Sequence, residues 1–226
     1  MDSQPTNVSV HPLRCAPLPE DRAERICDDL QQQGYSIQLG CLPADILNAL
    51  QEQIMTLDER EFFRAGIGRN NQHHTNDFVR SDEVCWMTGE TPPGAAWLVW
   101  AETLRVAINR RLFMGLFSFE SHYAWYRAGA YYKRHYDAFR GQTNRVLSVV
   151  AYLNSDWCAD DGGELVLYKD GLDREGLRVT PLAGTVVVFL SEEFPHEVLP
   201  ARRDRFSIAG WYRVNSSNAT AVDPPR

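Results

Sequence analysis

The sequence predicts an α+β fold in which helices come first and a closed or double-layer sheet of short strands follows. The chain has 226 residues, which is long enough for one large domain with a sizeable core. Apolar residues recur at helical spacing only before about residue 113. From about Ser118 onward they alternate or form short runs, and glycine-bearing turns separate most of these runs.

Three helices and one strand are expected before the sheet. Acidic residues open a first helix at 20–33 and Gly34 ends it, while residues 35–39 alternate as in a strand. A second helix starts at residues 43–45, because its apolar residues as far as Leu57 fall on one face. A third helix is expected at 94–113.

The second half of the chain contains eight candidate strands, at 121–127, 131–137, 146–153, 164–168, 177–181, 185–190, 196–199 and 205–214. Residues 64–79 are polar and without period, and so long a loop inside a compact domain is usually functional or disordered. We therefore expect a flexible arm at 1–18, one domain at 19–215 and a flexible tail at 216–226. Within the domain, 19–113 supports a sheet core at 118–215.

Composition narrows the classes of function. The net charge is −7 and the sequence pI is near 5.4, so a nucleic acid is not expected as the main partner. The longest apolar stretch, 95–101, is far shorter than a membrane span, and no secretory signal opens the sequence. The five cysteines are widely spaced and odd in number, which favours a reducing cytoplasm over a disulfide framework.

A candidate metal site comes from two candidate strands. His135 and Asp137 are two residues apart, so in a strand their side chains point to the same face. A charged carboxylate inside the sheet is costly unless something pairs with it, and a metal ion would do so. His196, on a distant strand, is the candidate third ligand. Two histidines and one carboxylate are the ligand set of non-haem Fe(II) oxygenases.

Arg205 begins a strand in which Ser207, Ala209 and Trp211 share its face. A guanidinium presents a fixed fork of donors that suits a carboxylate, and the small residues beside it leave room. This pattern is typical of a slot for a dicarboxylate that bridges the arginine and the metal. The alternative is a surface arginine in a basic loop, because Arg202 and Arg203 are close in the sequence. By contrast, we expect His122 to be structural and His73 and His74 to be solvated, rather than a second metal site.

Several blocks resemble the 2-oxoglutarate- and Fe(II)-dependent prolyl hydroxylases of the hypoxia-sensing type and their bacterial relatives. The resemblance is read in residues 132–137, 152–157, 162–165, 194–200 and 205–212, and more faintly in 79–82 and the N-terminal helices. It implies a double-stranded β-helix (jelly-roll) core with N-terminal supporting helices. It also implies Fe(II), 2-oxoglutarate and O2 as cofactor and cosubstrates, with ascorbate as a support for the reduced iron.

The resemblance further implies residue roles. His135, Asp137 and His196 would ligate Fe(II), and Arg205 and Tyr152 would bind the distal carboxylate of 2-oxoglutarate. The cosubstrate slot would be lined by Tyr126, Val150, Leu165, Val198 and Ser207. The residues near a peptide substrate would be Trp211 and Arg145, with Arg80 and Asp82 anchoring a mobile finger loop at 64–79.

The implied activity is hydroxylation of a prolyl residue in a protein, with release of succinate and CO2. From the sequence we expect the enzyme itself to be cytoplasmic and monomeric. If the chain is bacterial, the resemblance points to a proline of elongation factor Tu. Two alternatives stay open: a 2-oxoglutarate oxygenase acting on a small molecule or another side chain, and a non-catalytic binding module that retains the fold. The long loop at 64–79 favours a macromolecular substrate, and the complete ligand set favours catalysis.

Overall fold

The computed structural model describes residues 18–64, 79–138 and 144–215, and in these residues the chain forms three α-helices and eleven strands. The helices are α1 (Glu20–Gln33), α2 (Ala44–Thr56) and α3 (Pro92–Leu112). The strands are β1 (Tyr35–Gln38), β2 (Phe63–Arg64), β3 (Glu83–Trp86), β4 (Leu116–Tyr126), β5 (Tyr132–His135), β6 (Arg145–Tyr152), β7 (Leu165–Leu167), β8 (Leu177–Val179), β9 (Val186–Leu190), β10 (His196–Val198) and β11 (Arg205–Val214).

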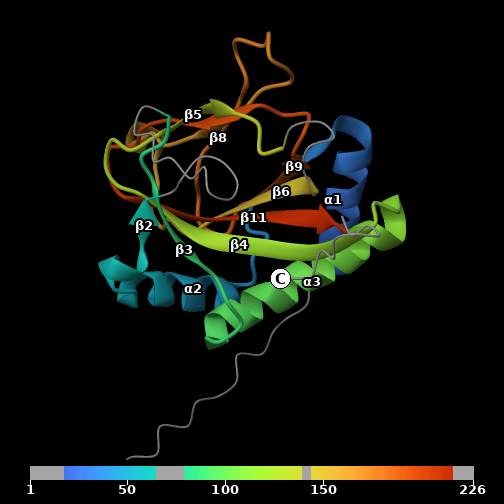
Figure 1. The fold of residues 1–226 in the computed structure, drawn as a ribbon, viewed down its shortest axis with the longest axis horizontal. Coiled ribbons are helices and arrows are strands. Elements are labelled where there is room, and N and C mark those ends of the chain that lie inside the picture. The colour runs from blue at the N-terminus through green and yellow to red at the C-terminus, as the bar shows by residue number, and fades with distance from the viewer. Residues whose placement is uncertain (1–17, 65–78, 139–143, 216–226) are drawn as a thin grey trace, which may run out of the picture.

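The strands form two antiparallel sheets that face each other as a jelly roll. The larger sheet has seven strands in the order β1-β9-β6-β11-β4-β3-β2, and the smaller has four in the order β5-β10-β7-β8. In Figure 1 strands β6, β11 and β4 of the larger sheet lie between helices α2 and α3 below and strands β5 and β8 of the smaller sheet above, and α1 lies at one side. The fold class expected from the sequence is confirmed, because helices support a double-layer, mostly antiparallel β core.

Strand alternation creates two separate cores. In β9, Val186 and Val188 pack toward the helices, while Val187 and Phe189 pack toward the smaller sheet. In β6, Leu147 likewise belongs to the helix-facing core. Because neighbouring residues of a strand point to opposite faces, one apolar run fills both layers. The interior between the two sheets is therefore lined by the core that contains Val187 and Phe189.

The supporting helices begin and end as the sequence expects, to within two residues. In α1 the buried residues Ile26, Cys27 and Leu30 face the core, and Gly34 ends the helix with a φ of 80°. A Cβ at Gly34 would also meet the ring of Phe194 at 2.8 Å, so only glycine suits this position. No helix in the described ranges is long and apolar enough to cross a membrane.

All eight candidate strands are present, the last with the predicted bounds and the other seven with shifted ends, and the structure corrects the expectation in four places. The short strands β2 and β3 were not expected, and they extend the larger sheet at one edge. Strand β4 begins five residues early, at Leu116. Strand β5 ends at His135, so Asp137 lies beyond it. Leu18 is buried in the core rather than part of a flexible arm, whereas residues 1–17, 65–78 and 216–226 lie outside the described residues.

Candidate active site

Three side chains predicted as metal ligands converge between the sheets. His135 at the end of β5 and His196 at the start of β10 are cross-strand partners in the smaller sheet. The Nε2 atom of each histidine lies 3.6 Å from a different carboxylate oxygen of Asp137. Their ligand atoms all lie within 4.8 Å of one another, and within the described part of the chain they are the sole such group.

Both imidazoles are oriented by the backbone two residues earlier. His135 Nδ1 lies 2.8 Å from the Lys133 carbonyl oxygen, and His196 Nδ1 lies 3.2 Å from that of Phe194. Because a carbonyl oxygen only accepts, each Nδ1 carries the proton and donates it. With Nδ1 bonded to the backbone, each ring directs Nε2 toward Asp137, the arrangement that metal-binding histidines commonly show.

Asp137 reaches the site from a bend after β5, and hydroxyl groups hold it there. Ser148 Oγ donates to Asp137 Oδ2 over 2.6 Å, and it also lies 2.9 Å from Ser191 Oγ. Burial opposes ionisation of this carboxylate, but the imidazoles of His196 and His135 and the Ser148 hydroxyl outweigh it, so its pKa lies well below the usual range. Burial and the nearby His135 lower the pKa of His196 to about 4. At neutral pH the set is thus one carboxylate and a neutral His196, as metal ligation requires.

These three groups fit a divalent iron centre. Two imidazole nitrogens and one carboxylate on one side of an ion leave the other positions open for small ligands. The buried charge of Asp137 also has no cationic Lys or Arg partner among the described residues. A metal ion would supply that missing charge.

Arg205 is buried in the same interior, and its environment suits the binding of an anion. Its side chain is 1% exposed, with Nε donating to the Gly163 carbonyl over 2.8 Å and Nη1 to Ser207 Oγ over 3.2 Å. No carboxylate of the described residues lies within ion-pairing distance of the Arg205 guanidinium. A buried charge without a partner is costly, so the site favours a bound anion. A bound carboxylate would complete this environment, as the sequence predicts.

Two tyrosine rings flank the guanidinium of Arg205. The Arg205 Cζ atom lies 4.9 Å from the ring centroid of Tyr126 and 5.1 Å from that of Tyr152. The Tyr152 hydroxyl is buried and makes no hydrogen bond with the described residues. Burial raises the pKa of Tyr152 to about 12, against the opposing charge of Arg205, so the hydroxyl stays protonated and can donate to an anion.

The structure brings the predicted cosubstrate residues into one place. They belong to the core between the two sheets or pack against it, or contact Arg205 directly: Tyr126, Val150, Tyr152, Leu165, Val198 and Ser207. Phe189 of the same core meets the His196 ring edge-on, with the ring centroids 4.8 Å apart. The apolar lining therefore extends from the arginine to the metal ligands.

Trp211 and Arg145, which were predicted near a peptide substrate, form a contact pair beside the metal ligands. Trp211 is the cross-strand partner of Ser148, the residue that binds Asp137. The Arg145 guanidinium lies 3.7 Å from the centroid of the Trp211 ring and donates to Glu120 over 2.7 Å. The Trp211 Nε1–H is buried without a hydrogen-bond partner among the described residues, so it is available to a ligand.

Arg80 and Asp82 are joined by two hydrogen bonds, of 2.7 and 2.6 Å, and the Asp82 side chain is fully buried. They lie against β5, since Arg80 forms a β-bridge with Tyr132. Fourteen of the sixteen finger-loop residues, 65–78, lie outside the described residues. The finger itself therefore stays a prediction.

Sequence reasoning missed two residues at this site. Ser148 is a polar residue within the apolar run of β6, and that interruption is a signal that could have identified it. Tyr132 stacks on His135 with ring centroids 3.5 Å apart, although the two are three residues apart and no strand periodicity brings them together. The irregular register between β5 and β10 at this point explains the contact.

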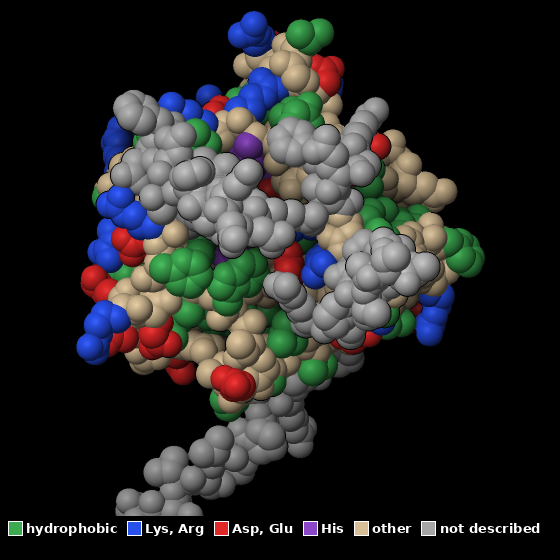
Figure 2. Space-filling model, in the orientation of Figure 1, with side chains coloured by type: hydrophobic (Ala, Val, Ile, Leu, Met, Phe, Trp, Pro, Cys, Tyr) green, Lys and Arg blue, Asp and Glu red, His purple; other side chains and the backbone are tan. Residues whose placement is uncertain are grey.

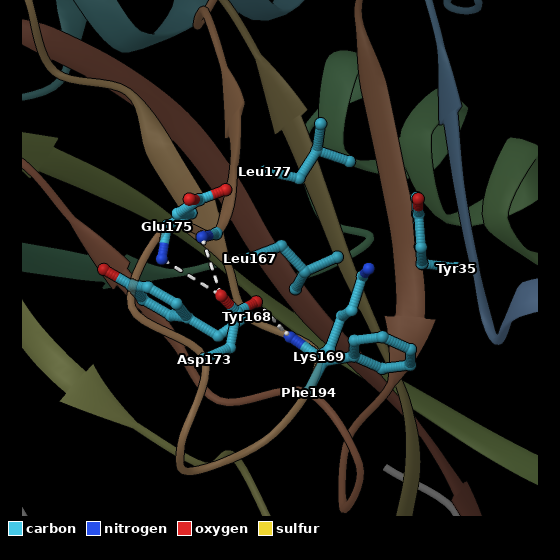
Figure 3. Close-up of a pocket in the computed structure, with 9 residues that line it drawn as sticks. Tyr35, Leu167, Tyr168, Lys169, Asp173, Glu175, Leu177 and Phe194 are labelled. Carbon is cyan, nitrogen blue, oxygen red and sulfur yellow. Dashed lines mark hydrogen bonds between the residues drawn. The ribbon is translucent and has the colours of Figure 1, made fainter.

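On the face drawn in Figure 2, histidine is visible near the middle, and side chains of both charge signs are spread around it. A separate hollow of about 250 Å³ lies near the loop between β7 and β8 (Figure 3). None of the predicted site residues lines it; its lining is Tyr35, Leu167, Tyr168, Lys169, Asp173, Glu175, Gly176, Leu177 and Phe194. The Asp173 carboxylate accepts backbone N–H groups of its own loop, so it shapes the loop.

Comparisons with known proteins point to one group of enzymes. A profile of the 2OG-Fe(II) oxygenase superfamily matches residues 121–213. A prolyl 4-hydroxylase from Pseudomonas putida is 39% identical, with a TM-score of 0.76 over 86% of this chain and 100% of that one. A Trichoplax adhaerens prolyl hydroxylase, solved with a hypoxia-inducible factor peptide fragment, is 25% identical, with a TM-score of 0.74 over 86% and 90%.

A curated relative, the hypoxia-inducible factor prolyl hydroxylase of Caenorhabditis elegans, is 27% identical over 223 residues. The match includes 88% of this chain and 29% of that protein, so the chain spans less than a third of its length.

Proposed function

Because this chain belongs to the prolyl hydroxylases of the 2OG-Fe(II) oxygenase superfamily, we propose that it hydroxylates carbon 4 of a prolyl residue in a protein, using Fe(II), 2-oxoglutarate and O2. One observation carries the proposal. The two-histidine, one-carboxylate group and a buried arginine without a carboxylate partner among the described residues line the same interior. Neither feature is explained by packing alone.

In this proposal His135, Asp137 and His196 hold Fe(II). Bound there with 2-oxoglutarate, the iron supplies oxidative decarboxylation to succinate and CO2 together with hydroxylation of the target carbon. The backbone carbonyls of Lys133 and Phe194 fix the two imidazoles with Nε2 toward the ion. This preorganisation spares the site the cost of ordering its ligands when the metal binds.

Arg205 and Tyr152 bind the distal carboxylate of 2-oxoglutarate. The guanidinium keeps its position through Gly163 and Ser207, which leaves donors for the carboxylate. The protonated Tyr152 hydroxyl adds a neutral donor. Val150, Leu165 and Val198 exclude water from the slot, which strengthens these charged hydrogen bonds.

The substrate is proposed to be a protein, since the Trichoplax relative was solved with a peptide fragment. Trp211 lies beside the metal ligands, and its Nε1–H has no partner among the residues that the structure describes, so it suits a backbone carbonyl of an extended peptide. Elongation factor Tu is the candidate target if the chain is bacterial. A supporting role for ascorbate, a monomeric state and a cytoplasmic location remain predictions from the sequence.

The test is a product measurement with defined partners. The purified chain with Fe(II) and 2-oxoglutarate is expected to release succinate faster when a protein substrate is added. Intact mass spectrometry of candidate proteins, elongation factor Tu among them, should show a gain of one oxygen atom. His135→Ala and Asp137→Ala variants should lose both signals.

Other outcomes separate the alternatives. Substrate-stimulated succinate release with small molecules alone would favour the small-molecule oxygenase. No succinate under any condition, with the metal bound, would favour the non-catalytic module. Full activity in both ligand variants at normal iron content would contradict the ligand assignment.

A further inference from the structure

A three-layer stack supports the metal-ligand candidate His135 through the face of its ring. The rings of Tyr132 and His135 are nearly parallel, at 13°, with centroids 3.5 Å apart. On the other face of Tyr132, the Arg80 Cζ atom lies 4.4 Å from the ring centroid. The tyrosine is therefore held between a guanidinium and an imidazole.

Asp82 holds the guanidinium of Arg80, which is the outer layer of this stack. Its carboxylate binds Arg80 through two hydrogen bonds of 2.7 and 2.6 Å, with side-chain exposures of 0% for Asp82 and 13% for Arg80. Burial disfavours the charged form of Arg80, but the Asp82 carboxylate outweighs it and raises the pKa of Arg80. A two-point contact of this kind fixes the plane of the guanidinium as well as its position.

The backbone of residues 79–81 is also hydrogen-bonded to the start of β5. Val79 O accepts the Lys133 N–H over 2.8 Å, and Tyr131 O accepts the Ser81 N–H over 3.0 Å. Residues 79–81 thus lie beside the start of β5 in a short antiparallel pairing. The stack does not depend on one flexible side chain.

The two histidines differ in what supports them. His196 lies on β10, which is paired on both sides, and its ring packs edge-on against Phe189 inside the core. His135 lies on β5, the edge strand of the smaller sheet, and its side chain is 14% exposed. Its Nδ1–H bond to Lys133 directs Nε2 toward the site but leaves the ring plane some freedom to tilt. Contact with the face of Tyr132 removes this freedom.

We propose that Tyr132 is a positioning residue for the iron ligand His135, and that Arg80 and Asp82 act by holding Tyr132 in place. The inference rests on the proposed function, because it assumes that His135 ligates the metal. It assigns Arg80 and Asp82 a task at the metal centre that is separate from any contact with substrate.

The test is a titration of the full-length chain with Mn(II), followed by electron paramagnetic resonance without turnover. Loss of a group that orients a metal ligand typically weakens metal binding by about 10–100-fold. We expect Tyr132→Leu to weaken Mn(II) binding at least tenfold, and Tyr132→Phe, which keeps the ring, to bind as the wild type. Arg80→Lys keeps the charge beside Asp82 but loses the flat face, so it should weaken binding by a smaller factor.

Arg127→Leu is the matched control. Arg127 also lies over an aromatic ring, 3.8 Å from the centroid of Trp125, and pairs with Glu83, but it has no contact with His135. Its loss should leave Mn(II) binding unchanged. Circular dichroism of each variant checks that the fold is retained, and Arg80→Lys decides the question if Tyr132→Leu does not fold.

The outcomes distinguish this inference from the proposed function. Wild-type-like Mn(II) binding by a folded Tyr132→Leu or, failing that, by Arg80→Lys overturns the positioning role alone. Absence of Mn(II) binding by the wild type overturns the proposed metal centre and this inference with it. Equal losses in Tyr132→Phe and Tyr132→Leu also overturn it, because the hydroxyl rather than the ring would then matter.

Discussion

The environment of Arg205 is the strongest sign of a ligand among single residues. Its guanidinium is withdrawn from water and its hydrogen bonds go to neutral oxygens of Gly163 and Ser207. The Tyr152 hydroxyl beside it is buried and unpartnered among the described residues. Buried polar groups are normally satisfied, so an unsatisfied donor next to a cation that lacks a carboxylate partner in the described ranges indicates a site for an anion.

Replacing Arg205 should therefore affect cosubstrate binding above all. We expect Arg205→Ala to weaken 2-oxoglutarate binding by about 2–5 kcal/mol, since a buried carboxylate would lose its charged partner. The measurement is succinate release as a function of 2-oxoglutarate concentration, with Mn(II) binding as the control for an intact metal site. An unchanged 2-oxoglutarate titration would contradict the role given to Arg205.

His122 is a second buried residue with a measurable consequence. It lies between Trp86 and Trp211, with ring centroids 5.2 and 5.4 Å away. Burial and the charge of Arg80, with a smaller effect of Arg145 and against Asp82, lower its pKa to about 4. The expectation that His122 is structural agrees with this packing, although the residue lies on the interior face close to the site.

This shift predicts a pH dependence of stability. Between about pH 4 and 6.5 the unfolded chain binds a proton at residue 122 that the folded chain does not, so the free energy of unfolding falls as the pH drops through this window. The contribution is of order 3 kcal/mol. Urea unfolding of the metal-free protein at several pH values should show a flatter profile for His122→Gln. Parallel profiles would show that His122 titrates normally.

Among the elements, α3 shows how close packing against the preceding turn overrides helix propensity. Thr91 caps the helix by accepting the Gly94 N–H at 3.2 Å, and two prolines follow the cap. A Cβ on Gly94 would lie 2.3 Å from the Thr88 carbonyl oxygen and 2.9 Å from Thr91 Oγ1. The chain before α3 folds back so closely that only glycine fits.

Gly94→Ala tests which effect wins. Propensity alone would stabilise the helix by up to about 1 kcal/mol. The clash with backbone should instead destabilise the protein by about 1–3 kcal/mol and lower Tm. Gly89→Ala is the control, because its Cβ would meet Leu98 at an ordinary 3.7 Å. A Tm for Gly94→Ala at or above that of the wild type would mean that the turn relaxes at little cost.

For the molecule as a whole, the site joins the two sheets. His135 and His196 belong to the smaller sheet, while Ser148, which holds Asp137, belongs to the larger one. A metal ion bound by these ligands would therefore link both layers of the jelly roll. Ligands that bind only the folded state stabilise it in proportion to the logarithm of their concentration.

Thermal unfolding with Mn(II) measures this coupling. At a concentration about 100 times Kd, binding contributes about 2.7 kcal/mol, which corresponds to a rise in Tm of roughly 5–10 °C for a protein of this size. His196→Ala should abolish the rise. A Tm that is insensitive to Mn(II) in the wild type would contradict a metal site between the sheets.

Much of this architecture could be predicted because it follows from the spacing of apolar residues and from turn residues along the chain. The alternation that sends Val187 and Val188 to opposite cores also identifies the strands, and three helices are marked by apolar spacing and by residues such as Gly34. Strand alternation made His135 and Asp137 candidate ligands, but the full set with His196 and Arg205 rested on the resemblance of several sequence blocks to a known family. Strand β2 escaped prediction because two residues carry no period.

The sequence by itself thus determined the order of helices and strands and the identity of the chemical groups at the site. Only the tertiary structure decided how these groups are held. Ser148 reaches Asp137 and Tyr132 reaches His135 because a bend and an irregular register bring them there. Such contacts depend on distances between separate segments, which the spacing of residues along the chain does not encode.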